Sequence, residues 1–250
     1  MKKIRLIVVN KKKLACVLLA TKLLLILLFF LFFGVSNHTT DITMDPSNIT
    51  IVIDPGHGGV DGGATVNDLS EKEVNLCIAK KLKTYLVQKN YKVIMTREED
   101  VSLDRLDNSS QSRHQRDLNA RTKIINNSNA HLFVSIHVNC NLKKPSTNGS
   151  IVFYSNKLSN NRNFAYSLQR SLNSMEINGQ KRTIHDPQEA RYYILENSSV
   201  SGALVETAFI SNSDEHKLLT TEEFTQQLAL SIGYGIEQYL YKYDNVFISK

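Results

Sequence analysis

The sequence predicts an α/β domain of three layers, a largely parallel twisted sheet flanked by helices, with an N-terminal membrane anchor. Two observations support this expectation. From residue 49 onward, short apolar runs typical of buried strands alternate with longer segments of helical periodicity. Residues 1–35 instead combine a basic start with one long apolar run. A chain of 250 residues can bury a full core, so one domain with an appendage is the natural organisation.

The appendage is expected to be an uncleaved anchor. Residues 2–13 are rich in Lys and Arg, and residues 14–35 are apolar apart from Thr21, Lys22 and Gly34. That length can cross a bilayer, and the positive flank places the N-terminus inside and the remainder outside. A cleaved signal peptide is the alternative, but the run does not end in a good small-x-small site. We therefore expect an extracytoplasmic protein tethered to the cell membrane, or a secreted one if the segment is removed.

The charge distribution argues against a nucleic-acid partner. The net charge of +6 comes from residues 1–40, which hold seven basic residues and no acidic one. The remaining chain is close to neutral, so it lacks the basic surface that nucleic-acid binding needs. Residues 36–48 are polar and are expected to form a tether, residues 49–243 the functional domain, and residues 244–250 a tail.

Within the domain, strands and helices are expected in alternation. The predicted strands are 49–53, 91–96, 131–136, 150–154, 191–195 and 202–206. The predicted helices are 71–88, 117–128, 160–175, 213–219 and 221–241. Two polar segments, 98–115 and 176–190, are expected to be surface loops, and the second could wall a substrate groove.

The stretch IVIDPGHGGVDGGA, residues 51–64, places five glycines around His57, far more than a tight turn needs. Glycines permit tight turns with positive φ and allow backbone to approach a ligand closely. An ordinary flexible loop is the alternative interpretation. A loop that follows a buried strand and a proline and encloses a histidine fits that alternative less well.

Three predicted strands end in, or run directly into, a chemically capable side chain: His57, His137 and Glu206. A fourth candidate, Glu71, opens the first helix of the domain. Because ligands bind beyond the carboxyl ends of strands in open α/β sheets, these residues are expected to converge. Two histidines and a carboxylate form a common ligand set for catalytic zinc, with a fourth position open to water. Each residue alone could equally be structural.

Some assignments stay open at this stage. Ser70 and Glu73 fit a capping box, which would occupy Glu73 and leave Glu71 free to reach a metal. Asn139, Arg121 and Ser135 could contact a substrate or simply hold the strand ends.

Five motifs follow one another in order: DPGHGG (54–59), SEKEVNL (70–76), RDLNARTKIIN (116–126), SIHVN (135–139) and ALVETAFISN (203–212). Over residues 49–241 the chain resembles the zinc-dependent N-acetylmuramoyl-L-alanine amidases of the amidase-3 type. The resemblance implies that His57, Glu71 and His137 bind one Zn²⁺ ion and that Glu206 is the catalytic carboxylate. Val138 departs mildly from the small residue that the family shows after SIH.

The resemblance implies hydrolysis of the amide bond between N-acetylmuramic acid and L-alanine in peptidoglycan. The short chain, with one anchor and no wall-binding repeats, is similar to the germination-specific amidases of spore formers, which take the first step to muramic δ-lactam in the cortex. Two alternatives remain: a non-catalytic peptidoglycan-binding module, and a zinc peptidase acting on the stem peptide. The polar segments 98–115 and 176–190 are candidate docking surfaces for an activating protein partner.

Overall fold

The structure is a computed structural model that describes residues 11–33, 45–177 and 179–242. The chain divides into two compact units, Met1–Thr43 and Met44–Lys250. The described part of the first unit is helix α1 (Lys11–Phe33). Among the described residues, no helix combines the length and the apolar character that a membrane crossing requires. The anchor therefore stays a prediction. The end of the apolar run, where cleavage of a signal peptide would fall, lies outside the described residues.

The second unit is built around a six-stranded sheet with the order β4-β1-β5-β10-β6-β9. These strands are β1 (Thr50–Pro55), β4 (Lys92–Met95), β5 (Leu132–Asn139), β6 (Ile151–Tyr154), β9 (Gln188–Glu189) and β10 (Ser201–Phe209). β4, β1, β5 and β10 run parallel to one another, whereas β6 is antiparallel to β10 and β9 is parallel to β6. The predicted α/β class with a largely parallel sheet is confirmed.

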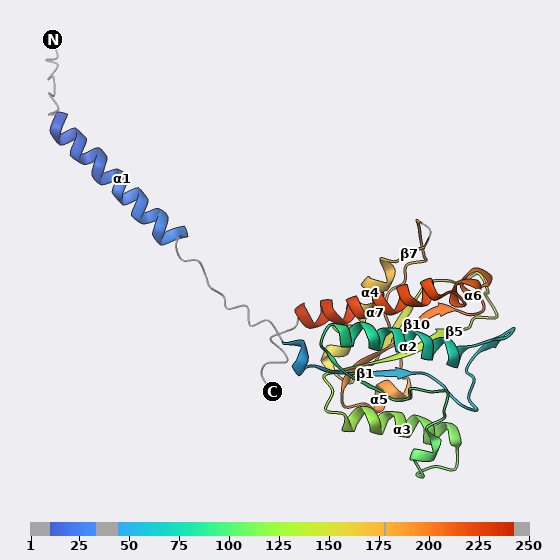
Figure 1. Cartoon of the computed structure of the whole chain (residues 1–250). Coiled ribbons are helices and arrows are strands. Elements are labelled where there is room, and N and C mark those ends of the chain that lie inside the picture. The colour runs from blue at the N-terminus through green and yellow to red at the C-terminus, as the bar shows by residue number, and fades with distance from the viewer. Residues whose placement is uncertain (1–10, 34–44, 178, 243–250) are drawn as a thin grey trace. The chain divides into compact units, whose positions relative to one another are not determined.

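Helices cover both faces of this sheet (Figure 1). α2 (Glu71–Gln88), α4 (Ser159–Asn173) and α7 (Glu222–Lys242) lie on one face, and α3 (Arg113–Asn127) and α5 (Tyr193–Asn197) lie on the other. The short α6 (Ser213–Leu219) follows β10 and precedes α7. The larger apolar core lies beneath α2, α4 and α7. A smaller core lies on the other face, where Phe133 and Leu204 pack with Ile125 and Ile194.

The predicted strand at 191–195 is wrong, because Tyr193–Asn197 is the helix α5. Aromatic and β-branched residues favour strands, but this preference gives way to packing. Ile194 and Leu195 are neighbours in sequence, and both are buried in the smaller core. A strand would have turned them to opposite faces, and one helical turn buries both.

The two polar segments also hold regular structure. Residues 98–115 contain a 3-10 helix, η2 (Asp104–Leu106), and the first residues of α3. Residues 176–190 contain the hairpin β7 (Glu176–Ile177) and β8 (Gln180–Lys181), and then β9. The remaining short elements are η1 (Pro46–Asn48) and the hairpin of β2 (Thr65–Val66) and β3 (Leu69–Ser70), which leads into α2.

Strand alternation decides which side chains meet at the carboxyl ends of the strands. Val52, Phe133 and Leu204 all face the smaller core. Because side chains two residues apart share a face, His137 of β5 and Glu206 of β10 point to that same side. The register pairs Glu206 directly with His137. The fold therefore brings the two residues together from positions 69 apart in the sequence.

Candidate metal centre and catalytic cleft

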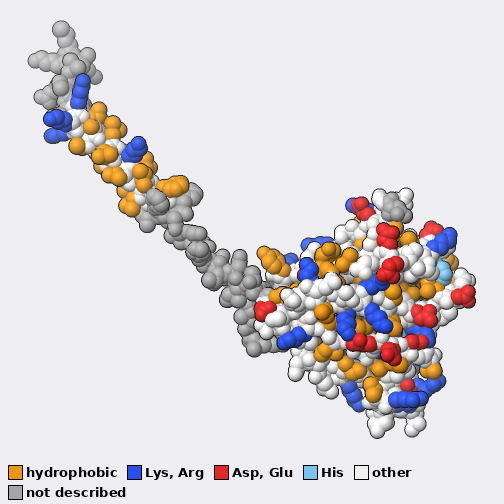
Figure 2. Space-filling model, in the orientation of Figure 1, with side chains coloured by type: hydrophobic (Ala, Val, Ile, Leu, Met, Phe, Trp, Pro, Cys, Tyr) orange, Lys and Arg blue, Asp and Glu red, His pale blue; other side chains and the backbone are white. Residues whose placement is uncertain are grey.

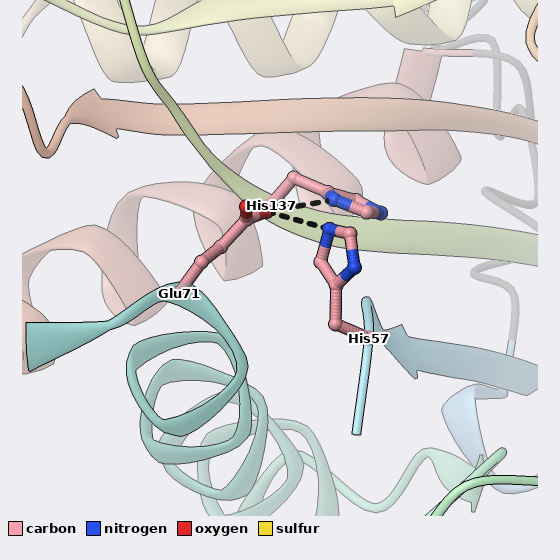
Figure 3. A group of neighbouring side chains, drawn as sticks. All are labelled: His57, Glu71 and His137. Atoms are coloured by element: carbon pink, nitrogen blue, oxygen red, sulfur yellow. Dashed lines mark hydrogen bonds and ion pairs between the residues drawn. The ribbon is translucent and has the colours of Figure 1, made fainter. Parts of the chain in front are cut away.

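His57, Glu71 and His137 form a tight group (Figure 3). Their ligand atoms all lie within 4.8 Å of one another. Glu71 Oε1 is 3.2 Å from His57 Nε2 and 3.0 Å from His137 Nδ1. The two imidazole rings meet edge to face, with centroids 5.0 Å apart. Two imidazoles and a carboxylate so arranged match the donor set of catalytic zinc.

Each member of this group comes from a different element. His57 follows β1 and has the unusual φ of 61°, Glu71 is the first residue of α2, and His137 lies in β5. The expected capping box is wrong, because the Ser70 side chain makes no capping hydrogen bond. The choice of Glu71 over Glu73 nevertheless agrees with the structure. The Glu71 side chain is buried against the two histidines, whereas Glu73 is exposed.

Two glycines make room for this group. A Cβ atom at Gly56 would lie 2.2 Å from the ring of His137. A Cβ atom at Gly63 would lie 2.5 Å from Glu71 Oε2 and 2.7 Å from His57 Cδ2. No side chain fits at such distances, so the glycine-rich stretch is packed directly against the three polar side chains.

Asp61 orients the first histidine of the group. Its Oδ2 lies 2.9 Å from His57 Nδ1, which directs Nε2 toward Glu71. A carboxylate on the second ring nitrogen is the usual partner of a metal-binding histidine. Burial opposes the charged imidazole, but hydrogen bonds with Asp61 and Glu71 outweigh burial and raise the pKa of His57 to about 10. The same pairing lowers the pKa of Asp61 to about 2, mainly through the hydrogen bond with His57.

Two buried arginines fix the backbone that leads to His57. Arg97 donates to the carbonyls of Pro55 and Gly56, at 3.0 and 2.9 Å. Arg121 donates to the carbonyls of Pro55 and His57, at 2.7 and 2.6 Å. Arg97 was not among the candidate residues predicted from the sequence. Its place directly after the predicted strand 91–96 is a position that many surface arginines share, so it does not indicate this role.

A buried carboxylate organises the strand ends behind the site. Asp54 accepts hydrogen bonds from Arg121, Thr96 and Ser135, at 2.8, 2.6 and 2.6 Å. Burial favours the neutral acid, but the charge of Arg121 and these hydrogen bonds hold the pKa of Asp54 below its usual value. Arg121 and Ser135 thus hold the strand ends. Asn139, the third residue left open by the sequence, lines the cleft described below, as Arg121 and Ser135 also do.

Glu206 lies beside the group as a second, separate carboxylate. Burial raises the pKa of Glu206 to about 7, with Glu71 adding to the effect and the two histidines opposing it. Its Oε2 is buried and has no hydrogen-bond partner among the described residues. A carboxyl group that titrates near neutrality is suited to accept and return a proton.

All four residues line one cleft of about 470 Å³. Arg191, Tyr192 and Tyr193 form part of its wall, and His114 contributes from α3. Among the described residues of 176–190, none lines this cleft, whereas Arg191, the residue directly after that segment, does. A histidine–glutamate–histidine group of this kind could hold a metal ion, and the buried carboxylate beside it in the open cleft could assist metal-dependent hydrolysis.

Residues 51–238 match the profile of a family described as N-acetylmuramoyl-L-alanine amidase, and the chain belongs to this family. Its members hydrolyse the amide bond between N-acetylmuramic acid and L-alanine in peptidoglycan. The resemblance seen in the sequence motifs is thereby confirmed.

Individual relatives agree with this assignment. The germination-specific N-acetylmuramoyl-L-alanine amidase of Bacillus subtilis (strain 168) is 37% identical over 192 residues, which cover 76% of this chain and 78% of that protein. The CwlD amidase from Clostridioides difficile, solved in complex with the GerS lipoprotein, is 34% identical with a TM-score of 0.67, covering 77% of this chain and 98% of that one. An N-acetylmuramoyl-L-alanine amidase from Clostridium difficile 630 is 30% identical with a TM-score of 0.66, covering 77% of this chain and 96% of that one.

Proposed function

We propose that this amidase works with one Zn²⁺ ion held by His57, Glu71 and His137, and that Glu206 is its catalytic carboxylate. The observation that carries the proposal is the Glu71 carboxylate lying within 3.2 Å of a nitrogen of each histidine, in the cleft that Glu206 also lines. Asp61 adds the orienting partner that metal-binding histidines usually have.

Zinc at this position would supply Lewis acidity, which polarises an amide carbonyl and acidifies water. The proton of the attacking water passes to Glu206, whose Oε2 has no hydrogen-bond partner in the described protein. Glu206 then returns that proton to the nitrogen of L-alanine as the amide bond breaks. The buried surroundings that raise its pKa to about 7 suit both transfers.

The decisive experiment is product analysis. The full-length chain is incubated with zinc and purified peptidoglycan, with Glu206→Gln as the control, and products are read by mass spectrometry. Free peptides that begin with L-alanine, beside glycan strands with bare muramic acid, support the proposal. Fragments cut within the stem peptide would support the zinc peptidase instead. Binding to peptidoglycan without products, by a folded and zinc-loaded chain, would favour the non-catalytic module.

The proposed setting is the spore cortex, where removal of the peptide is the first step to muramic δ-lactam. The support is the 37% identity to the germination-specific amidase of Bacillus subtilis (strain 168). A deletion strain whose cortex keeps normal muramic δ-lactam would rule this setting out.

An activating protein partner is a second part of the proposal, supported by the CwlD amidase having been solved with the GerS lipoprotein. Comparing turnover by the purified chain with turnover in the presence of extracytoplasmic lipoproteins from the same cells tests it.

The proposed location is outside the cytoplasm, tethered through the N-terminal segment. The support is the basic stretch 2–13 followed by the apolar run 14–35. Cell fractionation with protease accessibility checks the location.

The face of the second unit drawn in Figure 2 interleaves basic and acidic side chains, which fits a peptidoglycan substrate better than a nucleic acid.

A further inference from the structure

We propose that Arg182 and Glu215 are positioning residues for Glu206, because they hold the irregular part of β10 that directly follows it. The inference rests on the proposed catalytic role of Glu206. Arg182 lies in the 176–190 segment and Glu215 lies in α6, and neither residue lines the catalytic cleft.

β10 changes register immediately after Glu206. Glu206 pairs with His137 of β5, but the next paired residue, Phe209, lies opposite Asn139. Three steps along β10 therefore match two steps along β5, so β10 carries one extra residue. Such a bulge bends the strand, leaves peptide groups outside the ladder and redirects nearby side chains.

Side chains satisfy the peptide groups around the bulge. The carbonyl of Thr207 accepts hydrogen bonds from Ser150 Oγ at 2.6 Å and from Arg182 Nη2 at 2.9 Å. The amide of Phe209 donates to Glu215 Oε2 at 2.7 Å. Because buried backbone groups need partners, these contacts favour the bulged conformation over a regular strand.

Arg182 and Glu215 also bind each other in the protein interior. Arg182 Nε lies 2.9 Å from Glu215 Oε1, and the two side chains are only 8% and 5% exposed. Arg182 Nη1 donates to Ser150 Oγ at 2.8 Å, and Glu215 Oε1 accepts from the amide of Gly149 at 2.9 Å. Among the described residues, the other hydrogen-bond partners of these two side chains lie in β10 or in the residues that lead into β6. The Arg182 guanidinium also lies over the ring of Phe224 in α7, 5.2 Å from its centroid.

Glu206 depends on this backbone support because its Oε2 has no hydrogen-bond partner among the described residues. The direction of its carboxylate therefore follows from the course of the strand. A further bond links the bulge to the metal group, since Thr207 Oγ1 donates to the carbonyl of His137 at 3.0 Å. Movement of the bulge would shift Glu206 relative to the ligands.

A matched control distinguishes positioning of Glu206 by Arg182 from a purely structural role. The control is a residue that also holds the backbone of β10, but far from Glu206. Asn161 of α4 is also buried, and its Oδ1 accepts from the amide of Gly202 at 3.0 Å, at the opposite end of β10. Arg182→Lys keeps the positive charge but loses the planar fork that reaches Thr207, Ser150 and Glu215 together. Asn161→Ala removes a comparable buried contact away from Glu206.

The experiment compares full-length wild type, Arg182→Lys and Asn161→Ala by turnover of a soluble muropeptide, zinc content, Tm and amide hydrogen exchange. We expect Arg182→Lys to lower kcat by about 10- to 100-fold, as small misplacements of catalytic groups do, with KM within about threefold and one zinc retained. Exchange should rise at residues 206–210. Asn161→Ala should lose about as much Tm as Arg182→Lys does. Its kcat should stay within about twofold of wild type, and its amide exchange should rise near residues 201–203.

Equal kcat values in Arg182→Lys and Asn161→Ala, or unchanged exchange at 206–210 in Arg182→Lys, would overturn the inference. Inactivity of the wild type, both alone and with the extracytoplasmic lipoproteins added, would instead overturn the proposed function. Hydrogen exchange would still decide whether Arg182 holds the bulge. If Arg182→Lys fails to fold, Ser150→Ala is measured in its place, because it removes one of the two donors to the Thr207 carbonyl. The same fall in kcat and rise in exchange at 206–210 are expected, both smaller.

Discussion

The Nδ1 atom of His57 lies 2.9 Å from the carboxylate of Asp61, four residues further along the same glycine-rich loop. This contact fixes the ring so that Nε2, the remaining nitrogen, faces Glu71. The loop thereby supplies both a proposed metal ligand and the group that orients it. His57 reaches this geometry with a φ of 61°, a conformation that residues other than glycine seldom adopt.

Replacing Asp61 should therefore weaken metal binding. In Asp61→Asn the side chain keeps its shape but loses the charge that orients and polarises the imidazole. We expect zinc affinity to fall about 10- to 100-fold, which is the usual effect of removing such a partner. Competition with a chromophoric chelator measures the change. Asp68→Asn, an exposed carboxylate between β2 and β3, is the matched control, and equal affinities in the two variants would contradict the assigned role of Asp61.

Metal binding should release a proton, because the pKa of His57 in the metal-free protein is about 10. Its imidazole is thus charged at neutral pH and must lose its proton before Nε2 can bind a cation. We expect zinc affinity to rise with pH. Calorimetry in buffers of different ionisation enthalpy should show about one proton released per zinc at pH 7. Release of none would contradict this assignment.

The same shift predicts how the stability of the metal-free protein depends on pH. The folded state raises the pKa of His57 from 6.5 to about 10, so the charged imidazole stabilises the fold in full below about pH 6.5. That contribution is lost as the pH rises toward 10. The Tm of the metal-free chain should therefore fall across this range. His57→Gln should flatten this decline, and an equally steep decline in that variant would assign it to other groups.

The sequence was most informative where a polar residue interrupts an apolar run. His137 and Glu206 each end such a run, and the parallel arrangement of strands places them together. It was least informative about contacts between distant polar segments. Arg182 and Glu215 are separated by 33 positions. Arg182 lies in a predicted surface loop and Glu215 in a predicted short helix, and neither pattern indicates that the two side chains meet. Arg97 likewise follows a strand as many surface arginines do, and only tertiary structure shows that it holds the loop of His57.

Local preference misled the prediction in two places. Residues 191–195 have the composition of a strand, yet burial of Ile194 and Leu195 on one side makes them helical. The Ser70 pattern fits a capping box, yet the β2–β3 hairpin holds the start of α2 differently. The amide of Glu71 donates to the carbonyl of Ala64, at 2.8 Å. The first constraint comes from packing against distant elements, which a sequence window does not contain. The second comes from the backbone of the adjoining hairpin, which the Ser70 pattern does not specify.

The two neighbouring glycines 62 and 63 offer a sharp test of close packing at the metal group. A Cβ atom at Gly63 would lie 2.5 Å from Glu71 Oε2, and Gly63 has a φ of +63°. Gly63→Ala should cost about 1–3 kcal/mol in stability and at least tenfold in zinc affinity. At Gly62 the nearest atom to a Cβ is Thr65 Oγ1, at an ordinary 3.5 Å. Gly62→Ala should behave like wild type, and equal losses in both variants would mean that the loop adjusts freely.

Glu206→Gln tests whether the two carboxylates of the cleft have different roles, with Glu71 as the proposed metal ligand and Glu206 as the proposed catalytic carboxylate. The amide cannot accept the proton of water, so kcat should fall by about 10²- to 10⁴-fold, while the zinc content stays at one ion. Glu73→Gln, the same change at an exposed position in the first turn of α2, should leave both unchanged. Loss of zinc in Glu206→Gln would instead make Glu206 a ligand.

The pH profile of the wild type supplies a second check on Glu206. Burial raises its pKa to about 7 in the metal-free protein, and a divalent cation nearby favours the charged carboxylate. The acidic limb of kcat/KM should therefore lie at or below about pH 7. Because the proposed role of Glu206 is to accept a proton in the reaction, activity should fall as the pH drops through that value. This limb should disappear from the residual activity of Glu206→Gln, and its persistence there would assign the limb to another group, such as a metal ligand that becomes protonated.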